Sequence, residues 1–205
     1  MTRFLSSLSL VLILAGCAVS SGVPADRIAE AGIAAAYLPL HAGGSFSFER
    51  LDGAATLVAP GIAATNAHNA RMVDPASVIG ATRDYDLLFF RVPGGRPPPM
   101  AEPVKGMAVI AYGQGKNRGL RRAQGVVRRI VSCPGCKAPA YFVFDGNAGP
   151  GFSGGPVVDS QGRLVGITFG YKDAQRRGGL RAIYAYDMAR VLAELQQVRS
   201  AAAKD

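Results

Sequence analysis

The chain has 205 residues, of which 49% are hydrophobic and 18% charged, so it can bury a full core and shows no bias toward disorder. Its net charge is +9, but its clustered arginines lack the interleaved aromatic side chains that stack nucleic-acid bases, which argues against nucleic-acid binding. A solvated face, attraction to anionic lipid or an acidic partner would each account for the charge. The 26 glycines and 13 prolines lie between short runs of Val, Ile and Phe, which favours a turn-rich all-β protein.

The first residues have the features of an export signal. Arg3 precedes an apolar stretch over residues 4–15, which is shorter than the roughly 20 apolar residues that a membrane-spanning helix needs. The stretch runs into Leu-Ala-Gly-Cys, which resembles the bacterial lipobox, whose Cys receives lipid and becomes the first residue of the mature protein. We therefore expect a signal peptide over residues 1–16, a lipidated spacer over residues 17–27 with Cys17 as its membrane anchor, and export to the periplasmic side of a membrane in the bacterial cell envelope. An ordinary signal peptide with an incidental Cys is the alternative.

Short apolar runs then recur along the chain with the length of β-strands. A segment rich in Gly and Pro, residues 93–99, separates them into two sets of six, because each Pro lacks the donor that a ladder needs. Near the end, Asp187 can cap a helix whose apolar positions fall on one face. The expected strands cover residues 34–40, 46–51, 55–59, 62–65, 78–81 and 87–92, then 107–112, 123–131, 141–144, 156–158, 164–169 and 180–186.

The strongest motif is Gly-Pro-Gly-Phe-Ser-Gly-Gly-Pro at residues 149–156. A nucleophilic serine must be held on a tight turn beside backbone donors, and glycines make such a turn accessible. Gly151 can direct its N–H toward the same point as the N–H of Ser153, and two such donors stabilise a developing oxyanion. The string resembles the Gly-X-Ser-Gly-Gly-Pro motif of the trypsin-like serine peptidases, with Ser153 as the nucleophile.

The resemblance extends to a base and an acid that precede Ser153. His68 lies in Ala-Thr-Asn-Ala-His-Asn, which is similar to the Thr-Ala-Ala-His segment that carries the base of this family and is preceded here as in its bacterial Deg-type members, whereas His41 has no such context. Asp86 directly precedes an apolar run, as in the family's Asp-Leu-Ala-Leu-Leu string, and would fix the tautomer of His68. Asp84 is its nearest competitor, since a shift of two residues along a strand keeps the same face.

The resemblance covers residues 28–200 and implies an all-β fold, with two antiparallel six-stranded barrels and the triad in the cleft between them. Barrel one would span residues 28–93 and barrel two residues 104–186, joined by a linker over residues 94–103 and followed by a C-terminal helix over residues 187–200. The implied function is that of a serine endopeptidase acting on a protein or peptide substrate without a cofactor, and no peptide-binding domain is expected after it.

Two departures from the family pattern bear on activity. Only 18 positions separate His68 from Asp86, fewer than in most relatives, so the loops of the first barrel must be short. Phe152 stands where trypsin has an acid that pairs with a freed N-terminus, so activation by that ion pair is not expected. Because Phe152 could disturb the turn, an inactive binding module with the same fold is the alternative function.

Specificity follows from the same resemblance. It places Asn147 at the base of the primary pocket, and Thr168, Phe169 and Gly170 on the wall that also pairs with substrate backbone. A cationic side chain would find no carboxylate at Asn147, so we expect a preference for small or medium-sized apolar residues before the scissile bond.

The remaining cysteines form the string Cys-Pro-Gly-Cys at Cys133 and Cys136. In an exported protein this spacing favours a local disulfide. A zinc site would need two further ligands, and a thioredoxin-like centre would begin a helix, whereas this pair lies between two expected strands. We therefore predict a structural disulfide and no metal site. A redox or metal protein built on this pair would also leave the serine motif without a purpose.

Overall fold

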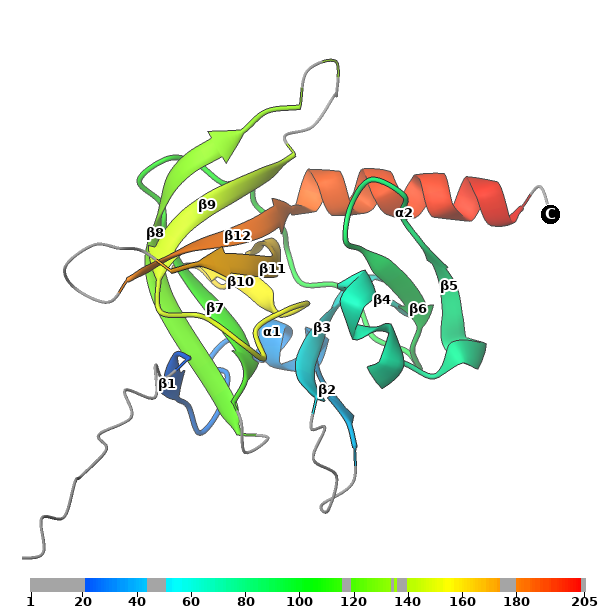
Figure 1. Cartoon of the computed structure of the whole chain (residues 1–205), viewed down its shortest axis with the longest axis horizontal. Coiled ribbons are helices and arrows are strands. Elements are labelled where there is room, and N and C mark those ends of the chain that lie inside the picture. Colours follow the sequence, from blue (N-terminus) through cyan, green and yellow to red (C-terminus); the bar gives the residue numbers. More distant parts are fainter. Residues whose placement is uncertain are drawn as a thin grey trace, which may run out of the picture.

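The computed structural model describes residues 21–43, 51–115, 119–133, 135, 140–173 and 180–203. These residues fold into two antiparallel sheets and a C-terminal helix that packs on both (Figure 1). After a short N-terminal segment that pairs with the second sheet, the chain builds the first sheet, crosses to the second, and ends on the helix. The predominance of β-structure agrees with the composition.

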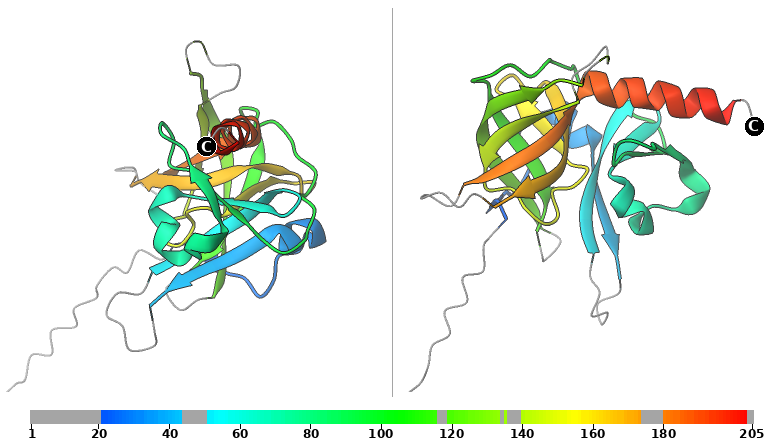
Figure 2. Two further views of the ribbon diagram at one scale, coloured as in Figure 1. Left: turned by 90° about the vertical axis from the view of Figure 1, so that its right-hand side faces the viewer. Right: turned by 45° about the horizontal axis from the view of Figure 1, so that its top comes forward.

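The second sheet closes into a barrel, as predicted for the second half of the chain. Its strands pair in the order β8-β7-β10-β11-β12-β9, and β9 pairs back with β8, so the described part of the ring has no free edge (Figure 2). Phe142, Phe144, Val157 and Ile183 fill the interior. The strands are β7 (Ala108–Gln114), β8 (Leu120–Val131), β9 (Tyr141–Gly146), β10 (Pro156–Asp159), β11 (Leu164–Lys172) and β12 (Arg181–Asp187).

The first sheet differs from the predicted six-stranded barrel. In the described residues it has five strands in the order β2-β3-β4-β6-β5, without a pairing that closes it. The strand expected over residues 34–40 begins only at Tyr37, because the alanine-rich segment before it is helical. Most of the strand expected over residues 46–51 lies outside the described residues. The elements are α1 (Ala31–Ala36), β2 (Tyr37–Ala42), β3 (Leu51–Ala59), β4 (Ile62–Thr65), β5 (Val78–Ala81) and β6 (Leu88–Arg91), with two 3-10 helices between β4 and β5, η1 (Ala67–Met72) and η2 (Pro75–Ser77).

The C-terminal helix α2 (Met188–Ala202) connects the two sheets. It begins as predicted at Asp187, whose carboxylate accepts the N–H of Arg190 at 2.7 Å. From the end of β12 the helix runs across β5 and also packs on β11 (Figure 1). Its buried Val191 and Leu195 join a core with Phe89 from the first sheet and Ile167 from the barrel.

Part of the expected N-terminal spacer is docked on the barrel. Val23–Pro24 form a short strand, β1, which pairs with β8. The N–H of Gly22 donates to the carbonyl of Asn147 at 2.8 Å, and the guanidinium of Arg121 donates to the carbonyls of Ser21 and Gly22 at 3.2 and 3.1 Å. We call residues 21–25 the N-terminal strap. No sequence periodicity indicated it, because two residues are too few to show one.

The linker between the sheets is also held in place. Met100 forms a bridge with Leu164 of β11. Leu164 donates its N–H to the carbonyl of Pro99 at 2.7 Å and accepts the N–H of Ala101 at 3.0 Å. The proline-rich segment therefore follows the surface of the barrel, although it cannot form a regular ladder.

Candidate active site

The three residues predicted to form a triad come from both sheets. His68 lies on η1, directly after β4, and Asp86 lies on the loop between β5 and β6. Ser153 lies on the turn between β9 and β10 of the barrel. The carbonyl of Ser153 accepts the N–H of Ala54 of β3 at 2.9 Å, so this turn sits directly against the first sheet.

Asp86 holds His68 at two points. One carboxylate oxygen lies 2.6 Å from Nδ1 of the ring, and the other accepts the backbone N–H of His68 at 3.0 Å. Because a carboxylate only accepts, Nδ1 carries the proton of this contact, and the lone pair of Nε2 is left free to act as a base. The side-chain amide of Asn66 donates to the backbone carbonyl of Asp86 at 2.8 Å and fixes the loop from the other side.

The environment of Asp86 keeps its carboxyl group ionised. Burial alone would raise the pKa of Asp86, but the hydrogen bond from the His68 ring, the charge of that ring and the N–H groups of His68 and Ala67 lower it below its ordinary value of 3.8. Asp86 is therefore a carboxylate at neutral pH. An ionised acid is what the orientation of a catalytic imidazole requires.

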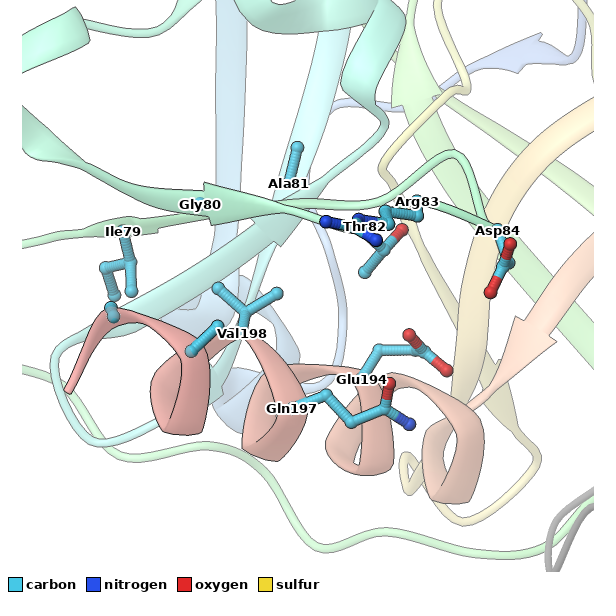
Figure 3. Close-up of a pocket in the computed structure, with 11 residues that line it drawn as sticks. Ile79, Gly80, Ala81, Thr82, Arg83, Asp84, Glu194, Gln197 and Val198 are labelled. Atoms are coloured by element: carbon cyan, nitrogen blue, oxygen red, sulfur yellow. The ribbon is translucent and has the colours of Figure 1, made fainter. Parts of the chain in front are cut away.

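The competing residues have other surroundings. Asp84 lines a hollow of about 390 Å³ between α2 and the end of β5, together with Glu194 and Gln197 (Figure 3). His41 pairs with Asp52 at 3.0 Å across the register of β2 and β3. The observed contacts therefore favour Asp86 over Asp84 as the partner of His68, whereas His41 has an acid partner of its own.

The turn that carries Ser153 presents two backbone donors. Gly151 has φ +90° and Gly154 has φ +83°, values that favour glycine. In the described part of the chain the N–H groups of Gly151 and Ser153 donate to no protein acceptor, whereas the N–H of Phe152 between them donates to the carbonyl of Gly149 at 3.1 Å. The two free donors are those expected for an oxyanion hole.

The side chain of Phe152 attaches this turn to the core of the barrel. Its side chain is 1% exposed and belongs to the core of the barrel, so it points away from a substrate. Its ring lies against the N-terminal strap, where a Cβ built on Gly22 would come within 2.7 Å of Cζ. Burial of the apolar Phe152 side chain therefore stabilises the turn at the position where trypsin has an acid paired with its N-terminus.

A second residue of η1 joins the turn to the first sheet. The side-chain amide of Asn69 donates to the carbonyl of Ser153 at 3.0 Å and to Oγ1 of Thr65 at 2.9 Å. In the described residues no hydrogen bond links the ring of His68 to the hydroxyl of Ser153, although Asn69 is the neighbour of His68 in the chain. In ligand-free enzymes such bonds are often long and tighten when substrate binds. The sequence did not indicate a role for Asn69, because its only visible feature was its position next to His68.

The sequence-family model of the trypsin-like peptidase domain matches residues 53–167, which is more than half of the chain. The chain belongs to the trypsin-like peptidase family. As a trypsin-like peptidase it is a serine-type endopeptidase. No curated protein matches it.

Solved structures share the fold of this trypsin-like peptidase at low sequence identity. The active form of the Rv3671c protease from M. tuberculosis has a TM-score of 0.64 at 17% identity, over 96% of this chain and 94% of that one. The HtrA-type protease AlgW with tripeptide has a TM-score of 0.60 at 19% identity, over 80% of this chain and 60% of that one. The apo form of the MamO protease domain from Magnetospirillum magneticum has a TM-score of 0.56 at 16% identity, over 80% of this chain and 97% of that one.

In this trypsin-like peptidase, one residue of the predicted substrate wall, Thr168, forms backbone hydrogen bonds with the turn that carries Ser153. Thr168 accepts the N–H of Gly154 at 2.8 Å and donates its own N–H to Gly155 at 3.0 Å, and its side chain is buried. Thr168 thus supports the turn. Phe169 is the irregular position of β11, where the register with β12 shifts. The roles of Asn147, Thr168, Phe169 and Gly170 in specificity stay predictions.

Two further expectations concern metals and membranes. Within the described ranges, no group of three or more His, Cys, Asp or Glu side chains could hold a metal ion. Over the same ranges, no helix has both the length and the apolar character needed to cross a membrane. Cys17 and Cys136 lie outside the described residues, so the lipid anchor and the disulfide with Cys133 stay predictions.

Proposed function

We propose that this trypsin-like peptidase hydrolyses peptide bonds through Ser153, His68 and Asp86. Nε2 of His68 removes the proton of the Ser153 hydroxyl as its oxygen attacks the scissile carbonyl, and the imidazolium then gives that proton to the leaving amine. Water repeats the sequence on the acyl-enzyme and releases the second product. The observation that carries the proposal is the two-point contact between Asp86 and His68, at 2.6 and 3.0 Å.

The N–H groups of Gly151 and Ser153 would stabilise the negative charge on the attacked carbonyl in both steps. Their freedom from protein acceptors among the described residues supports this role. The alternative, an inactive binding module, was suggested by Phe152. That side chain lies in the barrel core and leaves the turn unobstructed, which favours the active enzyme.

A fluorophosphonate probe tests for an activated serine. The wild-type protein should be labelled, and Ser153→Ala should not, because the probe reacts with a serine whose proton a base removes. Asp86→Asn should slow labelling by about 10³- to 10⁴-fold, since the wrong tautomer of His68 then faces the serine. The exposed Ser160 offers a matched control, and Ser160→Ala should react like the wild type. Equal labelling of the wild type and Ser153→Ala would refute the proposal.

We also propose that the peptidase is exported and anchored in the cell envelope through lipid on Cys17. The apolar stretch of residues 4–15 and the Leu-Ala-Gly-Cys string support this proposal. An exported location also suits a disulfide between Cys133 and Cys136. In cells given a labelled fatty acid, the wild type should take up label, and Cys17→Ala should remain unlabelled and differ in gel mobility. Absence of label from the wild type would rule out the anchor.

A further inference from the structure

In the proposed triad, the nucleophile Ser153 must be held at a fixed position relative to the Asp86–His68 pair, because the nucleophile and the pair belong to different sheets. On the serine side, Ala54 and Asn69 hold the carbonyl of Ser153 at 2.9 and 3.0 Å. On the acid side, the backbone N–H of Asp86 donates to the phenol oxygen of Tyr186 at 3.0 Å. Tyr186 belongs to β12 of the barrel, so this bond connects the acid to the sheet that carries the nucleophile.

Aromatic contacts hold the ring of Tyr186 independently of its hydroxyl. It stacks on Phe169 with ring centres 4.1 Å apart and an angle of 15° between the planes. The ring of Tyr85 meets it edge-on, with centres 5.6 Å apart. The guanidinium of Arg190 on α2 lies 4.8 Å from the centre of the Tyr85 ring and is paired with Glu194 at 3.1 Å. The hydroxyl of Tyr186 is therefore presented to Asp86 from a fixed position.

We propose that Tyr186 is a positioning residue for the Asp86–His68 pair, an inference that rests on the proposed function. Asp86 grips His68 at two points, so any displacement of the Asp86 backbone also moves the ring. The backbone of Asp86 is held on both sides, its carbonyl by Asn66, which directly follows β4, and its N–H by Tyr186 of the barrel. The distance between base and nucleophile then depends on the Tyr186 contact.

The contact does not titrate over the range in which a serine peptidase works. Burial raises the pKa of Tyr186 to about 12, although the hydrogen bond from the Asp86 N–H opposes the rise. The phenol therefore stays neutral, and its oxygen remains an acceptor. Any pH dependence lost or gained on removing the hydroxyl must come from other groups.

Tyr186→Phe tests the proposal, because it removes one oxygen atom and keeps the ring. Tyr184→Phe is the matched control: Tyr184 lies on the same strand, its ring is 5.9 Å from that of Phe169, and its hydroxyl makes no hydrogen bond to the described residues. We expect kcat to fall roughly ten- to a hundredfold in Tyr186→Phe, with KM within about twofold of the wild type, since a small misplacement of a catalytic group is costly. Tyr184→Phe should keep both constants within about twofold.

Two readouts separate positioning from a merely structural role. Turnover is expressed per site labelled by the fluorophosphonate, so loss of folded protein cannot lower it. The acid limb of the kcat/KM profile should move to lower pH in Tyr186→Phe, because His68 loses stabilisation of its charged form. Wild-type turnover per labelled site with an unchanged acid limb would overturn the inference and leave the proposed function standing. A wild type that is not labelled at Ser153 would overturn both.

Discussion

At the scale of single residues, Gly154 lies at a tight contact between the two sheets. A Cβ built on it would lie 1.9 Å from the carbonyl oxygen of Ala54 and 2.3 Å from Oγ1 of Thr65. Its φ of +83° is also unfavourable for any residue with a side chain. The motif needs glycine here because β3 passes directly over the serine turn.

We therefore expect Gly154→Ala to lower the free energy of unfolding by about 3 kcal/mol or more, since it combines backbone strain with overpacking. Gly94 is the matched control, because it has φ +64° but a Cβ built on it would meet nothing within 4 Å. Gly94→Ala should lose only about 1 kcal/mol, from strain alone. Urea unfolding curves measure both values, and an equal cost at the two positions would contradict the packing argument.

The sequence pointed to the candidate-site residues that lie in local motifs and missed those that make contacts between distant parts of the chain. Ser153, His68 and Asp86 stand in short strings whose chemistry can be argued from neighbours in the chain. Asn69 and Tyr186 reach partners 84 and 100 positions away, so no local pattern marks them. Asp84 and Asp86 could be ranked but not separated, because only the folded loop shows which one meets His68.

At the scale of elements, α2 begins on a buried acid. Burial raises the pKa of Asp187, helped by the charge of Glu102, while the N–H groups of Arg190 and Ala189 and the charge of Arg190 oppose the rise. The folded protein then binds the proton of Asp187 more tightly than the unfolded chain. Stability from this group is therefore present at low pH and falls as pH rises above the ordinary value of 3.8.

Substitutions of Asp187 should separate its charge from its role as a cap. Asp187→Asn keeps an oxygen for the Arg190 N–H but carries no charge, so its stability relative to the wild type should rise between about pH 3 and about pH 7. Asp187→Ala lacks the cap and should be less stable than Asp187→Asn by about 1 kcal/mol throughout. Thermal unfolding at several pH values gives both differences. A pH-independent difference between Asp187→Asn and the wild type would show that burial of the charge has no cost.

Apolar runs located most elements, short ones included, and missed α1 and β1. The barrel strands and α2 overlap the predicted ranges, and the four-residue strands β4 (Ile62–Thr65) and β5 (Val78–Ala81) have the predicted bounds. The end of the helix Ala31–Ala36 falls in a predicted strand, since its apolar alanines fit either structure. The two-residue strand β1 has no period at all, and its place depends on Arg121 and the edge of β8.

At the scale of the molecule, the prediction of a two-part β fold with a C-terminal helix is confirmed, and the closed second barrel with it. Of the six strands predicted for the first half, five are present in the described residues, and most of the sixth, over residues 46–51, lies outside them. Twelve short runs along the chain suggested a symmetric division. The pairing of strands, which decides closure, depends on contacts that a single sequence does not display.

If Cys17 carries lipid as proposed, the docked strap limits how far the enzyme can lie from the membrane. Only 21 − 17 = 4 steps of chain separate this anchor from Ser21. A fully extended chain covers ~3.5 Å per residue, so the tether spans at most about 14 Å. From Ser21 onward the chain is clamped by Arg121 and by pairing with β8. The catalytic domain would then lie close to the lipid headgroups, and it would cleave only substrate proteins that come near the bilayer surface.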